Sequence, residues 1–230
     1  MEYFFNNYPS FTTKTGMAND RNRLNQRYKA IIDWNKSYIA KRSVLDIASH
    51  DGRWAFAALK ARAQHVTCVE PRESHIKWIH ANMKENGANL SDYTVIQGDI
   101  HAELEKFKER QFDMVFCLGF FYHTLEHGSI LRHLKRIQPD YMVFDTRISQ
   151  GQEKAILLHW ERSDHGLMAY DSHNNNYLCG VPTQAALEDM FKWCGYSWEY
   201  FNWSTVAEIP SDYVKDRVTV RLTRNELKNT

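Results

Sequence analysis

The stretch 44–70 constrains the fold more than any other part of the chain. A short apolar strand, 44–48, leads into a turn of small and polar residues and then into a helix, 54–63. The next strand ends on Glu70, 24 positions after Asp46. In doubly wound α/β sheets, small residues in such a turn let the chain pass beneath a nucleoside, and an acidic residue at the next strand end accepts the ribose hydroxyls. The stretch therefore predicts a nucleoside-binding α/β sheet.

The following sequence repeats this alternation of strands and helices. Strands are expected at 66–70, 95–97, 112–118 and 141–145, separated by helices at 75–85, 104–107 and 130–137. Near-continuous apolar strands are typical of a parallel sheet that is buried on both faces. Two later strands, 196–203 and 218–222, are expected to pair as an antiparallel edge. The predicted fold class is α/β, a doubly wound, mostly parallel sheet with an antiparallel C-terminal edge.

Two segments are expected to lie beside this sheet. Residues 1–40 are interpreted as an N-terminal arm, irregular over about the first 20 residues, and a helix that together form a lid. Residues 41–230 form the nucleoside-binding domain. Within that domain, 150–182 is interpreted as a loop over the site, with a strand at 156–160 and a polar stretch at 164–176.

Composition narrows the possible partners. The 29 Lys plus Arg nearly balance the 28 Asp plus Glu, for a formal net charge of +1, so the overall charge does not favour nucleic acid. The four cysteines form no C-x-x-C pair, so the sequence does not indicate a zinc site. Free cysteines are typical of a reducing compartment. The sequence has neither a membrane-spanning apolar run nor a signal-peptide pattern. We expect a cytoplasmic protein with no membrane partner, and a homo-oligomer remains open.

The turn and the strand ends together resemble class I S-adenosylmethionine-dependent methyltransferases over about residues 40–150. The turn Asp46–Gly52 matches their cofactor loop, in which an acidic residue is followed by alternating glycines. Glu70 stands at the ribose position, and Asp99 with Ile100 stands at the adenine position. The resemblance implies a Rossmann-like, seven-stranded sheet and S-adenosyl-L-methionine as the cofactor.

The resemblance also implies which residues bind that cofactor. They are Asp46, Ala48, Ser49, His50, Gly52, Glu70, Pro71, Asp99, Ile100 and Leu118. The chain departs from the family pattern at Ala48 and His50, where glycine is commoner. Alanine still permits a close approach, whereas His50 is expected to point outward.

A dinucleotide-dependent oxidoreductase is the alternative for this turn, because Rossmann enzymes also place an acid about 20 residues further on. Two observations favour the methyltransferase. The turn lacks the G-x-G-x-x-G that approaches a pyrophosphate, and an ionised Asp46 would repel one. The cofactor of methyltransferases has an amino-acid end and no phosphate.

His123 is the predicted general base. It lies in the segment 119–124, which follows the fourth strand at the edge where open α/β sheets hold their ligands. A hydroxyl acceptor must lose its proton near the moment of attack, and a histidine suits that task. Hydrogen bonding to its own loop or to the second strand is the alternative role.

Asp145, at the end of the fifth strand, is the second catalytic candidate. With His123, Asp51 or Glu70 it would offer ligands for Mg²⁺, which prefers carboxylate oxygens. A strand-end aspartate is also commonly a helix cap or the partner of an arginine, so the metal ligands stay unassigned.

Two subgroups of methyltransferases resemble the chain further. Small bacterial sugar O-methyltransferases, of the mycobacterial type that acts on methylmannose, resemble it at 48–54, at 119–124, at Arg23-Leu24 and at Arg27-Tyr28-Lys29. That resemblance implies O-methylation of a polar small-molecule acceptor, with a divalent cation and His123 as base. The fourth strand and Val181-Pro182-Thr183 resemble the tRNA uridine carboxymethyltransferases. An RNA or protein methyltransferase and a non-catalytic nucleoside-binding module therefore remain the alternatives.

Overall fold

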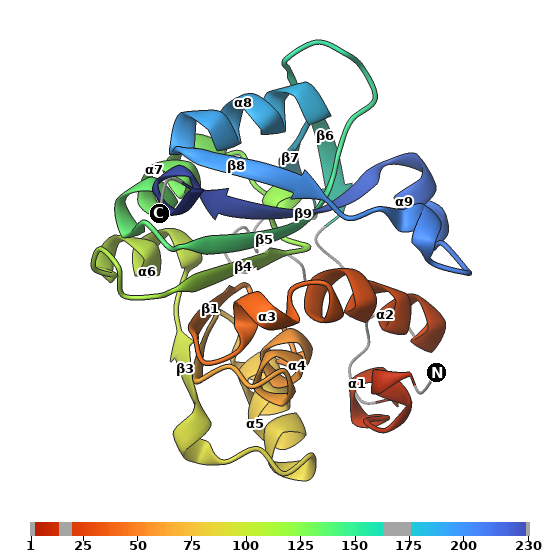
Figure 1. Cartoon of the computed structure of the whole chain (residues 1–230), viewed down its shortest axis with the longest axis vertical. Coiled ribbons are helices and arrows are strands. Elements are labelled where there is room, and N and C mark those ends of the chain that lie inside the picture. Colours follow the sequence, from red (N-terminus) through yellow and green to blue (C-terminus); the bar gives the residue numbers. More distant parts are fainter. Residues whose placement is uncertain (1–2, 14–19, 163–175, 229–230) are drawn as a thin grey trace.

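The main sheet contains seven strands in the order β3-β2-β1-β4-β5-β9-β8 (Figure 1). The computed structural model of the chain describes residues 3–13, 20–162 and 176–228. The strands of this sheet are β1 (Ser43–Ile47), β2 (His65–Glu70), β3 (Tyr93–Gln97), β4 (Met114–Leu118), β5 (Tyr141–Arg147), β8 (Tyr196–Tyr200) and β9 (Arg217–Arg224). β1 to β5 are parallel, whereas β9 runs antiparallel to both β5 and β8. The predicted fold class is confirmed.

Helices cover both faces of the sheet. One face carries α2 (Arg21–Tyr28), the π-helical turn η2 (Lys29–Asp33), α3 (Lys36–Ile39), α4 (Arg53–Lys60) and α5 (Glu73–Glu85). The other face carries α6 (Ile100–Lys106), α7 (His127–Ile137) and α8 (Gln184–Cys194). Neighbouring strand residues alternate between the two cores, since Val44 belongs to the first and Leu45 to the second. This alternation explains why the parallel strands are apolar at nearly every position.

The first residues form a structured part of the first core. They contain η1 (Phe4–Asn6) and α1 (Ser10–Thr13), and the side chains of Phe5 and Phe11 are fully buried. The Phe5 ring meets Trp54 at 5.7 Å, and the Phe11 ring meets Phe56 at 5.3 Å, both measured between ring centroids. The prediction of an irregular arm is therefore wrong for residues 3–13, because a few large aromatic side chains bury enough apolar area to order the segment.

A separate antiparallel hairpin follows β5. It consists of β6 (Ile156–Arg162) and β7 (Asn176–Pro182). The strand expected at 156–160 is confirmed, whereas β7 replaces part of the segment interpreted as a loop. Most of the polar stretch predicted at 164–176 lies outside the described residues.

Short elements complete the described chain. They are η3 (Leu90–Asp92), η4 (Phe121–His123), η6 (Trp203–Thr205), α9 (Ser211–Lys215) and η7 (Asn225–Lys228). Across the ranges that the structure describes, no helix has the length and apolarity needed to cross a membrane. Of these elements, η4 matters most for the site because it follows β4 and carries His123.

Candidate active site

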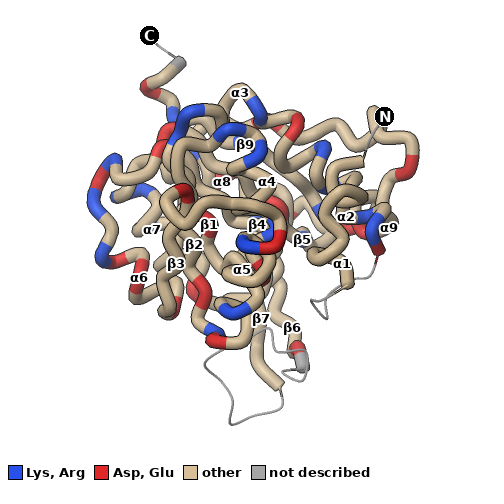
Figure 2. The backbone as a smooth tube through the Cα atoms, turned by 90° about the horizontal axis from the view of Figure 1, so that it is seen from below, with Lys and Arg blue, Asp and Glu red and all other residues tan. Residues whose placement is uncertain are grey.

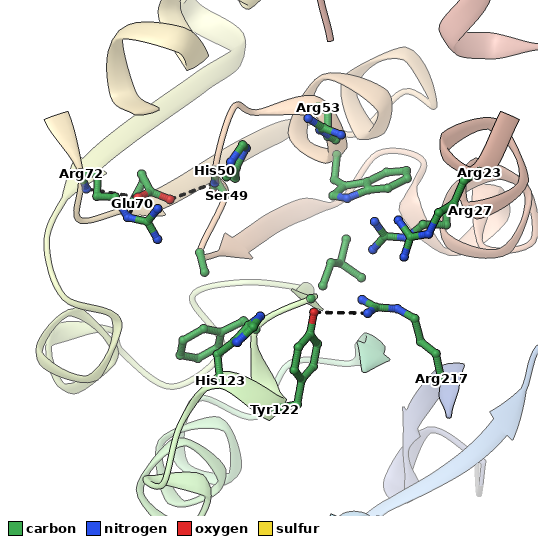
Figure 3. A pocket seen from close by; sticks show the side chains of 15 residues that line it. Arg23, Arg27, Ser49, His50, Arg53, Glu70, Arg72, Tyr122, His123 and Arg217 are labelled. Atoms are coloured by element: carbon green, nitrogen blue, oxygen red, sulfur yellow. Dashed lines mark hydrogen bonds and ion pairs between the residues drawn. The ribbon is translucent and has the colours of Figure 1, made fainter. Parts of the chain in front are cut away.

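A cavity opens at the carboxyl ends of β1 and β4 (Figure 3). The strand order reverses between these two strands, and such a switch point is where open α/β sheets bind ligands. The cavity is lined by Arg23, Arg27, Ala48, Ser49, His50, Arg53, Trp54, Glu70, Arg72, Leu118, Gly119, Phe120, Tyr122, His123 and Arg217. Segments from α2 to β9 thus meet at the predicted edge of the sheet.

The turn after β1 has three residues in the left-handed backbone region. Ala48 and His50 both have φ of 55°, and Gly52 has φ of 77°. These are the alternating positions at which the related cofactor loops carry glycine, so the backbone keeps the loop shape although two positions bear side chains. A non-glycine residue in this region costs roughly 1–3 kcal/mol. The His50 ring lies against His75, with 4.3 Å between ring centroids.

Glu70 connects this turn to the end of β2. Its side chain is buried, and Oε2 accepts a hydrogen bond from the backbone N–H of His50 at 2.9 Å. Oε1 accepts from the backbone N–H of Arg72 at 3.2 Å. Each carboxylate oxygen can accept a second hydrogen bond, so these contacts fix the carboxylate and still leave it able to bind ligand hydroxyls.

Asp46 lies beneath the turn and outside the cavity lining. Its side chain is buried, and within the described part of the chain Oδ2 has no hydrogen-bond partner. Burial, together with the charges of Asp51 and Glu70, raises the pKa of Asp46 to about 8. Asp46 is therefore mostly protonated at neutral pH. A protonated Asp46 would not repel a pyrophosphate, whereas the turn still lacks the G-x-G-x-x-G that approaches one.

The other predicted cofactor residues divide into two groups. Ala48, Ser49, His50, Glu70 and Leu118 line the cavity, whereas Asp46, Gly52, Pro71, Asp99 and Ile100 lie outside its lining. Asp99 is the N-cap of α6, where its Oδ1 accepts hydrogen bonds from the backbone N–H groups of His101 and Ala102. A contact with adenine would therefore have to use the rest of the Asp99 carboxylate.

The carboxylates considered for Mg²⁺ are already paired with arginines. Asp51 accepts from Arg53 Nε at 2.8 Å and from Nη2 at 2.6 Å. Although burial alone would raise it, the Arg53 guanidinium holds the pKa of Asp51 well below its usual range. Asp145 accepts from Arg27 Nη2 at 2.9 Å and from Arg217 Nε at 2.8 Å. These carboxylates do not fit Mg²⁺, which would have to displace the guanidinium groups.

Asp145 also lies outside the cavity lining. Its second oxygen accepts hydrogen bonds from the Tyr213 hydroxyl at 2.5 Å and from Thr219 Oγ1 at 2.8 Å. Burial opposes ionisation of Asp145, but Arg217 and Arg27 outweigh it and hold its pKa below the usual range. The geometry therefore matches the alternative role, the partner of an arginine, and not the predicted catalytic one.

His123 lines the cavity and is itself held by the hairpin. Its Nδ1 lies 2.6 Å from Oε2 of Glu161 on β6, and the Tyr177 hydroxyl on β7 donates to the same oxygen at 2.7 Å. Among the described residues, the group of side chains suited to a metal is His123, Glu161 and Cys179, whose ligand atoms all lie within 4.8 Å of one another. A histidine nitrogen and a thiol are not the oxygen ligands that Mg²⁺ prefers.

Arginines dominate one wall of the cavity. Arg23, Arg53 and Arg72 each face an acidic partner, respectively Asp212, Asp51 and Glu70. Arg27 and Arg217 both pair with the carboxylate of Asp145, and Arg217 Nε also lies 4.0 Å from Asp212 Oδ2. Arg217 Nη1 donates to the Tyr122 hydroxyl at 3.2 Å, and Arg27 Nε is buried without a hydrogen-bond partner in the described residues. The wall therefore carries more positive than negative charge.

Sequence comparison finds a family match in the central part of the chain. Residues 44–138 match the family profile described as "Methyltransferase domain". A curated relative, "tRNA U34 carboxymethyltransferase" from Nautilia profundicola, is 26% identical over 175 residues, which cover 71% of this chain and 52% of the relative. The chain therefore spans about half the length of that relative.

Solved structures share the fold. The N-terminal domain of EvdMO1, crystallised in the presence of S-adenosylhomocysteine and D-fucose, has a TM-score of 0.63 at 15% identity, covering 84% of this chain and 79% of that domain. The 1,6-didemethyltoxoflavin-N1-methyltransferase of Burkholderia thailandensis has a TM-score of 0.61 at 14% identity, covering 86% and 78%. These likenesses show that the chain shares the fold of these structures, and its residues 44–138 match a methyltransferase domain.

Proposed function

We propose that the chain transfers a methyl group from S-adenosylmethionine to an oxygen of a polar small molecule such as a sugar. The observation that carries this proposal is the convergence of the glycine-like turn, Glu70 and His123 on one cavity at the switch point of the sheet. The choice of oxygen and of a sugar rests on the resemblance to sugar O-methyltransferases and on the histidine at the cavity.

In this proposal the residues of the cavity have separate roles. S-adenosylmethionine, when bound, supplies a methyl group on an electrophilic sulfonium. The turn at Ala48 brings backbone close to the ligand, and Glu70 binds the ribose hydroxyls. His123 would take the proton of the acceptor hydroxyl as the oxygen–carbon bond forms and the methyl–sulfur bond breaks, with S-adenosylhomocysteine as the leaving group. The apolar walls at Trp54 and Leu118 exclude water and help to hold acceptor and donor in line.

A methyl-transfer screen tests this proposal. Purified protein is incubated with methyl-labelled S-adenosylmethionine and with sugars, small hydroxy compounds, amines or tRNA, each with and without Mg²⁺. We expect label in a hydroxy compound, independent of Mg²⁺, and a loss of about 10²-fold or more in rate for His123→Ala with cofactor binding retained. Failure of every acceptor class would favour a non-catalytic nucleoside-binding module.

A second candidate is the transfer of a carboxymethyl group to RNA, the activity that the name of the Nautilia relative describes. The arginine wall supports it, because Arg27 and Arg217 converge on Asp145 and would pair with a carboxylate on the transferred group. Figure 2 shows basic and acidic residues interspersed along the backbone, which gives less support to an extended RNA surface. The binding of an RNA substrate would weaken steeply as the salt concentration rises, whereas the binding of a sugar would not.

We also propose that the N-terminal segment closes the cavity. Its helix α2 supplies Arg23 and Arg27 to the lining, which supports the predicted lid. Arg23 Nη2 lies 2.5 Å from Asp212 on α9, so the wall is tied to the C-terminal part of the chain. Disrupting this pair by Asp212→Asn is expected to raise the KM for the acceptor more than it lowers kcat, as measured by steady-state kinetics.

A cytoplasmic location is part of the same proposal. All four cysteines are buried free thiols, at Cys68, Cys117, Cys179 and Cys194. Burial raises the pKa of each thiol, to about 12 for Cys179 and Cys194, which keeps these groups protonated and unreactive. Unpaired thiols are typical of a reducing compartment.

A further inference from the structure

We propose that Glu161 is the positioning residue for His123, and that the β6–β7 hairpin holds it in place. This inference rests on the proposed role of His123 as base. Glu161 lies 38 residues from His123 in sequence and on a strand outside the main sheet. Its Oε2 nevertheless approaches Nδ1 of His123 to 2.6 Å, and both side chains are mostly buried.

This contact selects the protonation state of the imidazole. Burial raises the pKa of Glu161, but hydrogen bonds from His123, His159 and Tyr177 outweigh it and lower the pKa to about 2. An ionised carboxylate can only accept hydrogen bonds, so the proton of a neutral His123 lies on Nδ1. The other ring nitrogen, Nε2, is then the basic one. A base oriented by a third group in this way is the arrangement that activates nucleophiles in many unrelated enzymes.

The Glu161 carboxylate is fixed from several directions. Tyr177, which pairs with Glu161 in the hairpin register, donates its hydroxyl to Oε2 at 2.7 Å. His159 Nε2 lies 3.0 Å from Oε1. The Tyr122 ring packs against the His123 ring itself, with 4.0 Å between the ring centroids. The titratable groups facing the pair are therefore Tyr122, His159, Tyr177 and Cys179.

The hairpin is attached to the loop that carries His123. The backbone N–H of Gly180 on β7 donates to the Thr124 carbonyl at 3.1 Å, and His127 Nε2 lies 3.0 Å from the Gly180 carbonyl. A Cβ at Gly180 would stand 2.7 Å from the Ile156 side chain and 2.8 Å from that of His127. Only glycine allows this approach without displacing a neighbour. The hairpin therefore places Glu161 at a set distance from His123.

The histidine tautomer tests the inference without substrate. Nitrogen NMR of ¹⁵N-histidine-labelled protein is expected to show His123 protonated on Nδ1 near neutral pH. In Glu161→Gln the neutral amide accepts more weakly, so we expect a mixture of tautomers, and Glu161→Asp is expected to restore part of the Nδ1–H population. Tyr177→Phe serves as a milder variant that keeps the carboxylate. An unchanged tautomer in Glu161→Gln would overturn the inference.

Kinetics and metal analysis supply the second test. For the acceptor identified in the screen, Glu161→Gln is expected to lower kcat about 10²-fold and to shift its pH profile, while cofactor affinity changes less than about twofold. A changed tautomer in a protein that transfers no methyl group would reject the proposed function and keep the positioning role. A stoichiometric transition metal in the purified protein, lost in Glu161→Gln, would instead overturn the positioning role.

Discussion

At the scale of single residues, three carboxyl groups lie close together around the turn after β1. Asp51 and Glu70 are paired with cations, whereas Asp46 is buried beside them and has no cationic partner among the described residues. Repulsion and burial therefore favour the protonated form of Asp46. A cationic ligand in the cavity would reverse this preference, because a nearby positive charge stabilises the ionised carboxylate.

Replacing Asp46 with Asn is expected to flatten the pH dependence of the unfolding free energy. The folded pKa is raised from 3.8 to about 8, so the native state binds more protons than the unfolded chain between these values. Wild-type stability should therefore fall as the pH rises through this range, and the variant should lack that contribution. Urea unfolding at several pH values measures the slope, with Asp189→Asn on the surface as the control. Equal slopes in wild type and Asp46→Asn would contradict the prediction.

Adding a Cβ in this turn and removing one are expected to change the unfolding free energy in opposite directions. Gly52→Ala places a side chain at a φ of 77° and 3.1 Å from Ile79, and it is expected to cost about 1–3 kcal/mol. Ala48→Gly removes a side chain at a φ of 55° and is expected to be neutral or stabilising by up to about 1 kcal/mol. Denaturant unfolding compares the two. A comparable loss of unfolding free energy in both variants would show that the left-handed backbone conformation does not determine the effect of a Cβ in this turn.

The elements differ in how far the sequence predicts them. The parallel strands are predicted well because each is a short apolar run between turns, and the two faces of the sheet require that pattern. β7 was missed because Tyr177 to Pro182 has no regular alternation and is ordered by pairing with β6. The N-terminal segment was misjudged because its order comes from packing against Trp54 and Phe56, which lie about 45 residues further along the chain.

Phe5→Ala tests whether the N-terminal segment belongs to the core. Phe5 is fully buried, so its truncation is expected to lower the unfolding free energy by about 3–5 kcal/mol. Leu90→Ala is the matched control, since Leu90 is 79% exposed and its truncation should change stability by less than about 0.5 kcal/mol. Denaturant titration followed by tryptophan fluorescence reports both. A loss below about 1 kcal/mol for Phe5→Ala would mean that the segment is dispensable for folding.

Part of the candidate site could be predicted from local sequence. The turn and Glu70 belong to one strand–turn–helix unit and the strand that follows it, so their spacing alone indicates a shared site. Arg217 and Glu161 could not be found in this way, because each reaches the cavity only through tertiary packing. Arg217, for example, contacts Tyr122 across 95 residues of sequence.

At the scale of the whole molecule, Asp145 joins the N-terminal helix to the last strand. Its carboxylate pairs with Arg27 from α2 and Arg217 from β9. Asp145→Asn would leave two buried guanidinium groups without their shared anion. Arg217→Met would instead leave Arg27 and Asp145 as one ion pair. We therefore expect Asp145→Asn to be the more destabilising, by about 3–5 kcal/mol. Thermal and urea unfolding compare them, and a smaller loss for Asp145→Asn would contradict the charge assignment.

Calorimetric titration with S-adenosylmethionine tests the central claim most directly. Wild-type protein is expected to bind one equivalent, and Glu70→Gln is expected to bind at least about tenfold more weakly, since one ionic hydrogen-bond acceptor is lost. Glu73→Gln is the control, because that side chain is 71% exposed at the start of α5. Folded wild-type protein that binds no cofactor, or a Glu70→Gln variant that binds it as tightly as wild type, would contradict the assignment of this cavity.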